Sequence, residues 1–517
     1  MEAKRLSLEL LFPAGGLHRR FAYQTQPPGT TPDALNCWPD TVLEGRRRGG
    51  SRPGLGKAST TLINAGGVFG LQSATWIESQ TVKTRLLAVG GGAIYREDTL
   101  DGTLSSLGGA LNPNKIIMSA VRDQVVYFAD HSDDQGLSGT TYQPKKLDLV
   151  TGVISNWVAN DGTIPKGCPI VCLYRDRLVL AGGTTDSHGL FYARQSDPLD
   201  WDDTEEDEGT AINSGTAPAG KVADIVTAAA AHSDQCLLVG CPTSLWLQRS
   251  DPGAGGWLEN LSSKIGIVDR FAWCRTTEGL FVFLSADGVW AVPASCSAAG
   301  DPQPISRLKL PEELLSVDRS TTQVSMAYDV RHRGIYIFLT PLTIGTEAAQ
   351  HWWLDWDTKS FWPFRFAHPS YDPYVCHDRE NYVSAHSGVI LGCRDGYLRR
   401  FRRDLPDDDD IDFNSYALLG PIGDPSMQRD TIVTEVSATL DENSGDVLAE
   451  IQSGSSPQAA FLATPKPFGR FRQGYSGNRF PRRRGQSHYV KLNGAKDGKP
   501  WAYDSGTAVI EHVGRRR

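Results

Sequence analysis

Two carboxylates in the segment Trp352-Trp353-Leu354-Asp355-Trp356-Asp357 have a spacing that could support chemistry. Two positions apart on a strand, Asp355 and Asp357 would face the same side and could form the acid/base pair of a hydrolase. A Trp-x-Asp sequence at a strand end is more often outer-strand packing followed by a turn, here Asp357-Thr358-Lys359-Ser360. No serine-hydrolase, zinc-protease or phosphate-loop motif accompanies the pair, since Gly90-Gly91-Gly92 lacks the following Lys-Ser/Thr. We therefore expect no enzyme.

Cysteine usage and the acidic runs do not indicate a metal site. The nine cysteines are scattered singly, which is typical of reduced, mostly buried thiols. The closest pairs, Cys168 with Cys172 and Cys236 with Cys241, do not have the spacing of zinc ligands. The acidic run over residues 202–208 lacks the spaced Asp-x-Asp-x-Asp-Gly pattern of a calcium loop. We expect neither a metal nor another cofactor.

Charge is segregated along the chain. Residues 1–60 hold nine Lys/Arg against five Asp/Glu, and residues 411–517 hold fourteen against eleven. Since the whole chain has a net charge of −8, residues 61–410 carry −15. Solvated loops are the plain interpretation of each charged run. The residues that stand out in the runs are Arg46, Arg47, Arg48, Arg52, Arg482, Arg483, Arg484, Arg515, Arg516 and Arg517 on the basic side, and Asp202, Asp203, Glu205, Glu206, Asp207 and Glu208 on the acidic side.

The elements between the two basic ends are predicted from a repeated hairpin. Short apolar runs followed by glycine turns begin at residues 86, 125, 178, 237, 280, 334 and 389. Such runs suit half-buried strands, and Gly-Gly or Asp-Gly supplies the positive φ of a tight hairpin turn. The spacing gives a period of about 50 residues, the length of a four-stranded propeller blade. The sequence thus predicts an all-β chain with about seven blades over residues 61–410, the alternative being a pair of β-sandwiches without a closed ring.

The two ends of the chain differ from the repeats. Residues 1–60 are dense in Pro and Gly, which favours an extended arm with turns. Residues 430–452 alternate in polarity and predict a strand, the turn 442–445 and a return strand. We expect residues 1–60 and 411–517 to join in a β-rich platform domain. No apolar stretch reaches the roughly 18 residues of a membrane span, and the opening segment does not resemble a signal peptide.

Both ends resemble one protein family. Asn36 and the segment Glu44-Gly45-Arg46-Arg47-Arg48-Gly49-Gly50-Ser51-Arg52-Pro53-Gly54 are similar to the "N … G … R-x-R-P-G" opening of tail nozzle (tail hub, tubular B-type) proteins of short-tailed bacteriophages. Arg483-Arg484-Gly485-Gln486-Ser487-His488, Gly498-Lys499-Pro500-Trp501 and the final Gly514-Arg515-Arg516-Arg517 look like the closing pattern of the same family. The motifs cover only the two ends, and Gly49-Gly50-Ser51 is an insertion relative to the family pattern.

The resemblance implies a structural virion protein, made in the cytoplasm of the bacterial host and placed in the tail. It implies six copies in a ring below the head-to-tail adaptor, with double-stranded DNA passing through the ring and fibres or spikes attached outside. On this interpretation the arginines above pair with carboxylates of the adaptor or the next subunit. The acidic run at 202–208 would line the passage and repel phosphates within about a Debye length of roughly 10 Å. The alternative is a carbohydrate- or protein-binding propeller outside any virion, in which aromatic residues stack on sugars; the residues concerned are Trp352, Trp353, Trp356, Phe361, Trp362, Phe364 and Phe366.

Overall fold

The structure is a computed structural model of the whole chain and describes residues 5–100, 102–132, 142–205, 207–293, 301–310, 312–315, 317–424 and 429–515. Strands dominate these residues, and the single α-helix, α1 (Pro457–Phe461), has one turn. The all-β prediction is confirmed. Within the described residues, no helix has the length and apolar composition that a membrane crossing requires.

Seven four-stranded antiparallel sheets follow one another along the described chain. The first three are β6 (Gly70–Glu78), β7 (Thr81–Gly90), β8 (Ala93–Glu97) and β9 (Leu104–Gly109); β10 (Met118–Arg122), β11 (Val125–Ala129), β12 (Lys145–Asp148) and β13 (Ile154–Asn156); and β15 (Ile170–Tyr174), β16 (Arg177–Ala181), β17 (Leu190–Tyr192) and β19 (Ile212–Asn213). The next three are β20 (Ala228–Ser233), β21 (Cys236–Gly240), β22 (Leu245–Arg249) and β23 (Trp257–Ser262); β24 (Trp273–Arg275), β25 (Phe281–Ser285), β26 (Gly288–Val292) and β27 (Gln303–Pro304); and β28 (Thr322–Asp329), β29 (Gly334–Pro341), β30 (His351–Asp355) and β31 (Ser360–Phe364). The seventh combines β32 (Pro373–Arg379), β33 (Gly388–Cys393) and β34 (Leu398–Arg402) with β5 (Gly54–Lys57).

The repeated apolar runs of the sequence occupy the same place in every sheet. They form β7, β11, β16, β21, β25, β29 and β33, the second strand of each. The apolar runs in these strands are buried, among them residues 86–90 of β7 and all of β16 and β21, which explains why they are continuous without alternation. Between β7 and β8 the turn is Gly91-Gly92, with φ of 59° and 82°. Only glycine takes both angles without strain, so this hairpin is set by the local sequence.

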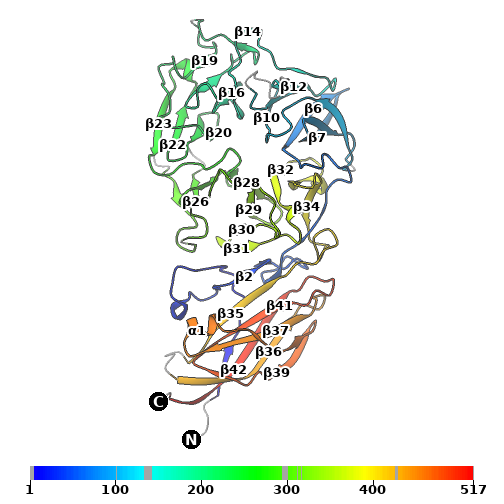
Figure 1. Cartoon of the computed structure of the whole chain (residues 1–517), viewed down its shortest axis with the longest axis vertical. Coiled ribbons are helices and arrows are strands. Elements are labelled where there is room, and N and C mark those ends of the chain that lie inside the picture. Colours follow the sequence, from blue (N-terminus) through cyan, green and yellow to red (C-terminus); the bar gives the residue numbers. More distant parts are fainter. Residues whose placement is uncertain are drawn as a thin grey trace.

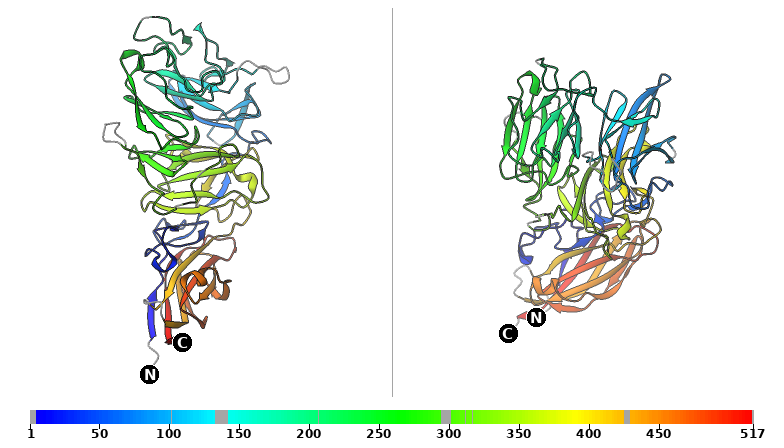
Figure 2. Two further views of the ribbon diagram at one scale, coloured as in Figure 1. Left: turned by 60° about the vertical axis from the view of Figure 1, so that its left-hand side comes forward. Right: turned by 45° about the horizontal axis from the view of Figure 1, so that its top comes forward.

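The seven sheets are arranged around a common centre (Figure 1). Their first strands lie innermost and contact one another in sequence: β6 contacts β10, β10 contacts β15, and β15 contacts β20. The contacts continue from β24 to β28, from β28 to β32 and from β32 back to β6. The fourth and fifth sheets pack through a shared apolar cluster that includes Ala230 of β20 and Phe281 and Phe283 of β25. Figure 2 shows the same seven sheets side by side in two further views of the molecule.

The strand β5 belongs to the N-terminal arm yet completes the last sheet. It pairs antiparallel with β34, with Leu55 opposite Phe401. Leu55 is fully buried. The Gly-Leu-Gly-Lys sequence of β5 has no apolar run that would indicate a strand, so the sequence predicted only turns here. Gly54 is required by space, since a Cβ at this position would lie 2.2 Å from the carbonyl oxygen of Asp407.

We call the circular arrangement of the seven sheets the ring. The chain ends form a domain of two sheets below it, the terminal domain (Figure 1). One sheet has the order β1 (Arg5–Glu9), β42 (Tyr503–Arg515), β36 (Arg429–Leu440) and β39 (Tyr475–Arg479), with β40 (Arg483–Gly485) also on β36. The other has the order β2 (Ala34–Leu35), β35 (Tyr416–Gly423), β41 (Ser487–Gly494), β37 (Val447–Gly454) and β38 (Lys466–Phe471). The two strands predicted within residues 430–452 exist as β36 and β37. They lie in different sheets, because their apolar faces pack against each other across the domain.

One hydrophobic core joins this terminal domain to the ring. It contains Val433 and Ile510 of the domain together with Trp353 and Trp362 of the sixth sheet. Trp38 of the arm stacks on Trp353 with ring centroids 4.4 Å apart. The aromatic cluster that could have stacked on sugars is therefore interior packing, and none of its members is more than 6% exposed: Trp352, Trp353, Trp356, Phe361, Trp362, Phe364 and Phe366.

Replacing Leu55 by Ala should lower the free energy of unfolding by about 2–5 kcal/mol, because a large buried side chain of the ring-completing strand is lost. Leu448 on β37 is 44% exposed, so Leu448→Ala should cost less than about 1 kcal/mol. Denaturant titration of both variants measures the difference. Equal losses in the two variants would contradict the interior role of β5.

Candidate functional site

Arg52 is the most fully coordinated side chain of the basic segment. It follows the short pair β3 (Cys37–Trp38) and β4 (Gly50–Ser51), and its side chain is completely buried. Its two terminal nitrogens donate to the two carboxylate oxygens of Asp408 at 2.8 and 2.6 Å. Its Nε donates to Oδ1 of Asn36 at 3.0 Å, and further donations reach the carbonyl oxygens of Pro53 and Arg365. Arg52 therefore has no surface to offer another subunit.

The partners of Arg52 come from three distant parts of the chain. Asn36, which has φ of 52°, donates from Nδ2 to the carbonyl oxygen of Asn414 at 2.6 Å and accepts from the backbone N–H of Arg365 at 2.9 Å. Asp408 also accepts from the backbone N–H of Ala367 at 2.9 Å. A buried ion pair repays its desolvation only when its remaining donors and acceptors are satisfied, as they largely are here. We call Asn36, Arg52 and Asp408 the central joint.

The Arg46–Arg48 triplet makes intramolecular ion pairs. Arg48 contacts Asp441 at 2.9 Å and Asp504 at 3.2 Å, both in the terminal domain. Arg47 contacts Asp357 at 3.0 Å in the sixth sheet. Among the described residues, Arg46 pairs only with nearby Glu44, at 3.1 Å, and its side chain is 67% exposed. Of the three, Arg46 is thus the one most open to another molecule.

Asp355 and Asp357 both face Arg47, whose Nη2 lies 3.8 Å from Asp355 and 3.0 Å from Asp357. Asp355 is buried and accepts from the backbone N–H and the hydroxyl of Thr358, which starts the turn after β30. Asp357 faces Arg47 and Arg333, with the Arg333 contact at 3.2 Å. Each carboxylate is thus committed to a structural partner.

The C-terminal arginines lie on the terminal domain. Arg482 lies just before β40 and Arg483 begins it, and both side chains are exposed. Arg484 pairs with Asp430 at 2.9 Å while its side chain remains 59% exposed. Arg515 ends β42, and its side chain is not described. Arg516 and Arg517 lie outside the described residues.

The acidic run lies at the end of the molecule opposite the terminal domain, after β18 (Asp200–Trp201), which pairs with β14 (Asp161–Gly162) (Figure 1). Asp202 accepts from the backbone N–H of Thr204 and begins a turn. Glu205 and Asp207 both pair with Arg194. The exposed carboxylates without an ion-pair partner among the described residues are Asp203 and Glu208, and Glu206 lies outside those residues.

The cysteines and acids show no metal centre in the described part of the chain, where no group of three or more ligating side chains converges. Seven of the cysteines in the described segments are free thiols, and burial raises the pKa of Cys172 and Cys376 to about 12. Cys236 is disulfide-bonded. The expectation of reduced thiols is therefore wrong for Cys236, because scattered spacing along the sequence does not exclude proximity in the folded chain.

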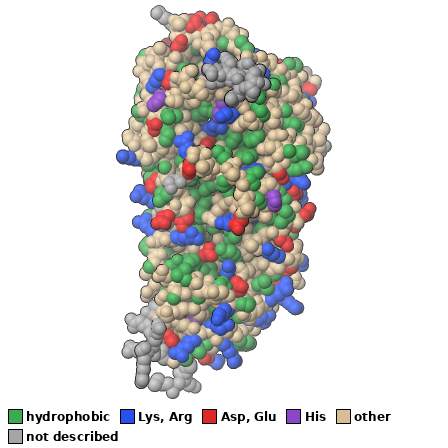
Figure 3. Space-filling model, viewed as in Figure 1, with side chains coloured by type: hydrophobic (Ala, Val, Ile, Leu, Met, Phe, Trp, Pro, Cys, Tyr) green, Lys and Arg blue, Asp and Glu red, His purple; other side chains and the backbone are tan. Residues whose placement is uncertain are grey.

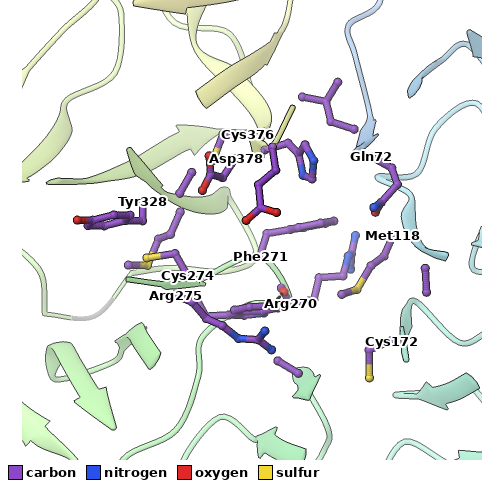
Figure 4. Close-up of a pocket in the computed structure, with 18 of the residues that line it drawn as sticks. Gln72, Met118, Cys172, Arg270, Phe271, Cys274, Arg275, Tyr328, Cys376 and Asp378 are labelled. Atoms are coloured by element: carbon purple, nitrogen blue, oxygen red, sulfur yellow. Dashed lines mark hydrogen bonds between the residues drawn. The ribbon is translucent and has the colours of Figure 1, made fainter. Parts of the chain in front are cut away.

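A cavity of about 720 Å³ lies at the centre of the seven sheets. It is lined by residues on or next to the first strand of each sheet, namely β6, β10, β15, β20, β24, β28 and β32. Figure 4 shows Arg270, Arg275 and Asp378 among its labelled side chains, with the sulfur atoms of Cys172, Cys274 and Cys376 nearby. The sequence did not reveal this site, because its residues come from every repeat and no two lie in a recognisable motif.

The cavity perturbs the ionisable groups that line it. Burial raises the pKa of Asp378 to about 7, with further contributions from the negative charges of Asp329 and Glu380. Burial lowers the pKa of His377 to about 4, so its ring is neutral at pH 7. Burial also lowers the pKa of Arg270 and Arg275. Asp378 is therefore the group in this cavity that changes charge near neutral pH.

Comparison with known proteins gives no relative: no family model and no curated protein matches this chain.

Arg52→Met should lower the free energy of unfolding by about 3–5 kcal/mol, because Asp408 would keep a buried charge without its partner. The matched variant Arg46→Met removes the same group from an exposed position and should change stability by less than about 0.5 kcal/mol. Denaturant titration at pH 7 compares the two. A loss for Arg52→Met no larger than for Arg46→Met would exclude a central joint.

Asp378→Asn should stabilise the protein increasingly as pH rises. The folded pKa of about 7 lies above the unfolded value of about 3.9, so the wild-type chain loses stability as pH rises between these values. The asparagine variant has no such loss, and the difference should reach on the order of 1–4 kcal/mol by pH 8. Unfolding free energies at pH 4.5 and 8 measure it, with the exposed Asp301→Asn as control. A difference that is the same at both pH values would refute the assignment.

Proposed function

We propose that the seven sheets are the blades of a closed seven-bladed β-propeller and that the chain is a subunit of a bacteriophage tail nozzle. Six copies would form a ring below the head-to-tail adaptor, with the propellers directed away from it. The ring order of the first strands and the completion of the last sheet by β5 support closure, because a strand from the chain start joins the final repeat. The terminal domain, β1, β2 and β35 to β42, would be the platform.

The observation that carries the proposal is the position of the motif that resembles nozzle proteins. Asn36, Arg52, Pro53 and Gly54 lie where the terminal domain meets the ring, and they hold the two together. A resemblance to nozzle proteins confined to exposed residues, which can vary freely, would be weak support for the proposed function. Here the matching residues build the junction between a repeat ring and a domain made from both chain ends, which is the architecture the family combines.

The charge distribution suits a conduit for DNA. Residues 61–410 carry −15, and their exposed carboxylates would repel phosphates rather than hold them. Asp203 and Glu208, which lack ion-pair partners among the described residues, would contribute most at the rim of the passage. Glu205 and Asp207 would contribute less because Arg194 neutralises part of their charge.

An amber mutation in the gene for this chain tests the proposal. Its phage should fill heads with DNA but produce tail-defective, non-infectious particles, and antibodies against the chain should label the tail of wild-type virions. A chain absent from purified virions, or an amber phage with normal infectivity, would overturn the proposal.

Asp203→Lys combined with Glu208→Lys should slow DNA ejection in vitro while leaving particle assembly intact. The effect should be larger at 0.01 M salt, where the Debye length is about 30 Å, than at 0.15 M. Asp123→Lys with Glu442→Lys, which changes the net charge equally at exposed positions elsewhere, is the control. Ejection rates equal to wild type at both salt concentrations would show that the acidic run faces away from the DNA.

A further inference from the structure

One stretch of the terminal domain is rich in positive charge and has no acidic residue in its own sequence. Residues 451–496 contain nine Lys and Arg and no Asp or Glu. Most of these residues fall on β38, β39 and β40 and on the segments that connect them. We call this set the basic edge, and its members are Lys466, Arg470, Arg472, Arg479, Arg482, Arg483 and Arg484.

The strand order brings these residues together. β38 is the outer strand of one sheet, and β39 and β40 follow one another along the outer side of β36 in the other sheet. Arg479 fixes β39 to β38, because its terminal nitrogen donates to the carbonyl oxygen of Arg470 at 2.9 Å and its guanidinium lies over the ring of Phe471. In Figure 3, Lys and Arg side chains gather over the lower part of the molecule, where this domain lies.

Most of this charge is not neutralised. Arg470 pairs with Asp446 at 2.7 Å, and Arg484 pairs with Asp430 at 2.9 Å. Arg472, Arg482 and Arg483 are exposed and have no acidic partner among the described residues. Such a surface repels itself unless an outside anion covers it, in contrast to Arg47 and Arg48, whose charges are already paired within the chain.

We propose that the basic edge binds the phosphate backbone of nucleic acid. A run of like charges on adjacent strands gains free energy by releasing the counterions condensed on a polyphosphate. These 46 residues contain no Asp or Glu, and Asp446 and Asp430 are the carboxylates of other segments that pair with their described side chains. Two exposed rings, Tyr475 at 72% and Phe480 at 59%, lie among the arginines and can stack on unpaired bases. The proposal goes beyond the nozzle function, does not rest on it, and gives Arg482 to Arg484 a partner other than a neighbouring subunit.

The test measures binding of the full chain to fluorescent 20-mer duplex and single-stranded DNA between 0.05 and 0.2 M NaCl by anisotropy. The variant Arg472→Gln, Arg482→Gln, Arg483→Gln removes three exposed charges that have no acidic partner among the described residues. The control variant Lys115→Gln, Lys264→Gln, Arg307→Gln removes three exposed charges from the seven-sheet region. Both variants change the net charge equally, and none of the substituted residues lies in the central joint.

The wild-type chain and the control should bind with log K falling linearly with log salt. The triple variant should bind at least tenfold more weakly at 0.05 M salt, and its duplex slope should be smaller by about 2–3, close to 0.9 for each phosphate that is no longer neutralised. Polyglutamate at equal charge concentration should not displace the DNA. The proposal would be overturned by no binding at 0.05 M salt or by equal effects of the two triple variants. Displacement by polyglutamate would also overturn it and would indicate that the basic edge binds an acidic protein surface instead.

Tyr475→Ala separates the stacking part of the proposal from the charge part. It should weaken single-stranded DNA binding by about 5–150-fold, the equivalent of about 1–3 kcal/mol per stacked base, and leave duplex binding and the salt slope unchanged. Equal weakening for both kinds of DNA would show that the ring only supports the fold of β39, and stacking would be excluded.

Discussion

The buried ion pair between Arg52 and Asp408 is the interaction on which the arrangement of this chain depends. It is set between the ring of sheets and the terminal domain, and both of its members are fully shielded from water. Through Asn36 the pair reaches the start of β35, and through the carbonyl oxygen of Arg365 it reaches the end of the sixth sheet. Because a buried charge without its partner is costly, the two bodies cannot separate here without exposing or stranding both ions.

Local chemistry was enough to predict the repeating part of the fold. Seven apolar runs mark the second strand of each sheet because those strands are buried on both faces, and Gly91-Gly92 fixes a hairpin turn by its backbone angles alone. β5 escaped prediction because what makes it a strand is the open edge of β34 some 340 residues later, not its own sequence. β36 and β37 were predicted as strands from their alternation, but alternation does not say which strand is the hydrogen-bonded neighbour.

The sequence alone showed where charged residues gather along the chain, but not which of them form ion pairs with one another. The segregation of acidic and basic residues is visible in the sequence, yet only the structure shows that Arg47, Arg48 and Arg52 pair with carboxylates of the same chain. Arg472, Arg482 and Arg483 have no acidic partner in the part of the chain that the structure describes. Residues 407–410 are all Asp in the sequence, which would suit a solvated loop, but Asp408 is buried and Asp409 contacts Arg399 at 2.9 Å. The central cavity could not be predicted, because the raised pKa of Asp378 arises from burial among strands of all seven repeats.

Hydrogen exchange of the Arg52→Met variant, followed by mass spectrometry on peptides across the chain, tests the central joint most directly. If Arg52 and Asp408 hold the two bodies together, exchange should accelerate together in β2 and β35 of the terminal domain and in β5 and β34 of the last sheet, while β15 and β16 on the far side of the ring keep their protection. Faster exchange confined to either body, or unchanged exchange in all four strands, would contradict this account.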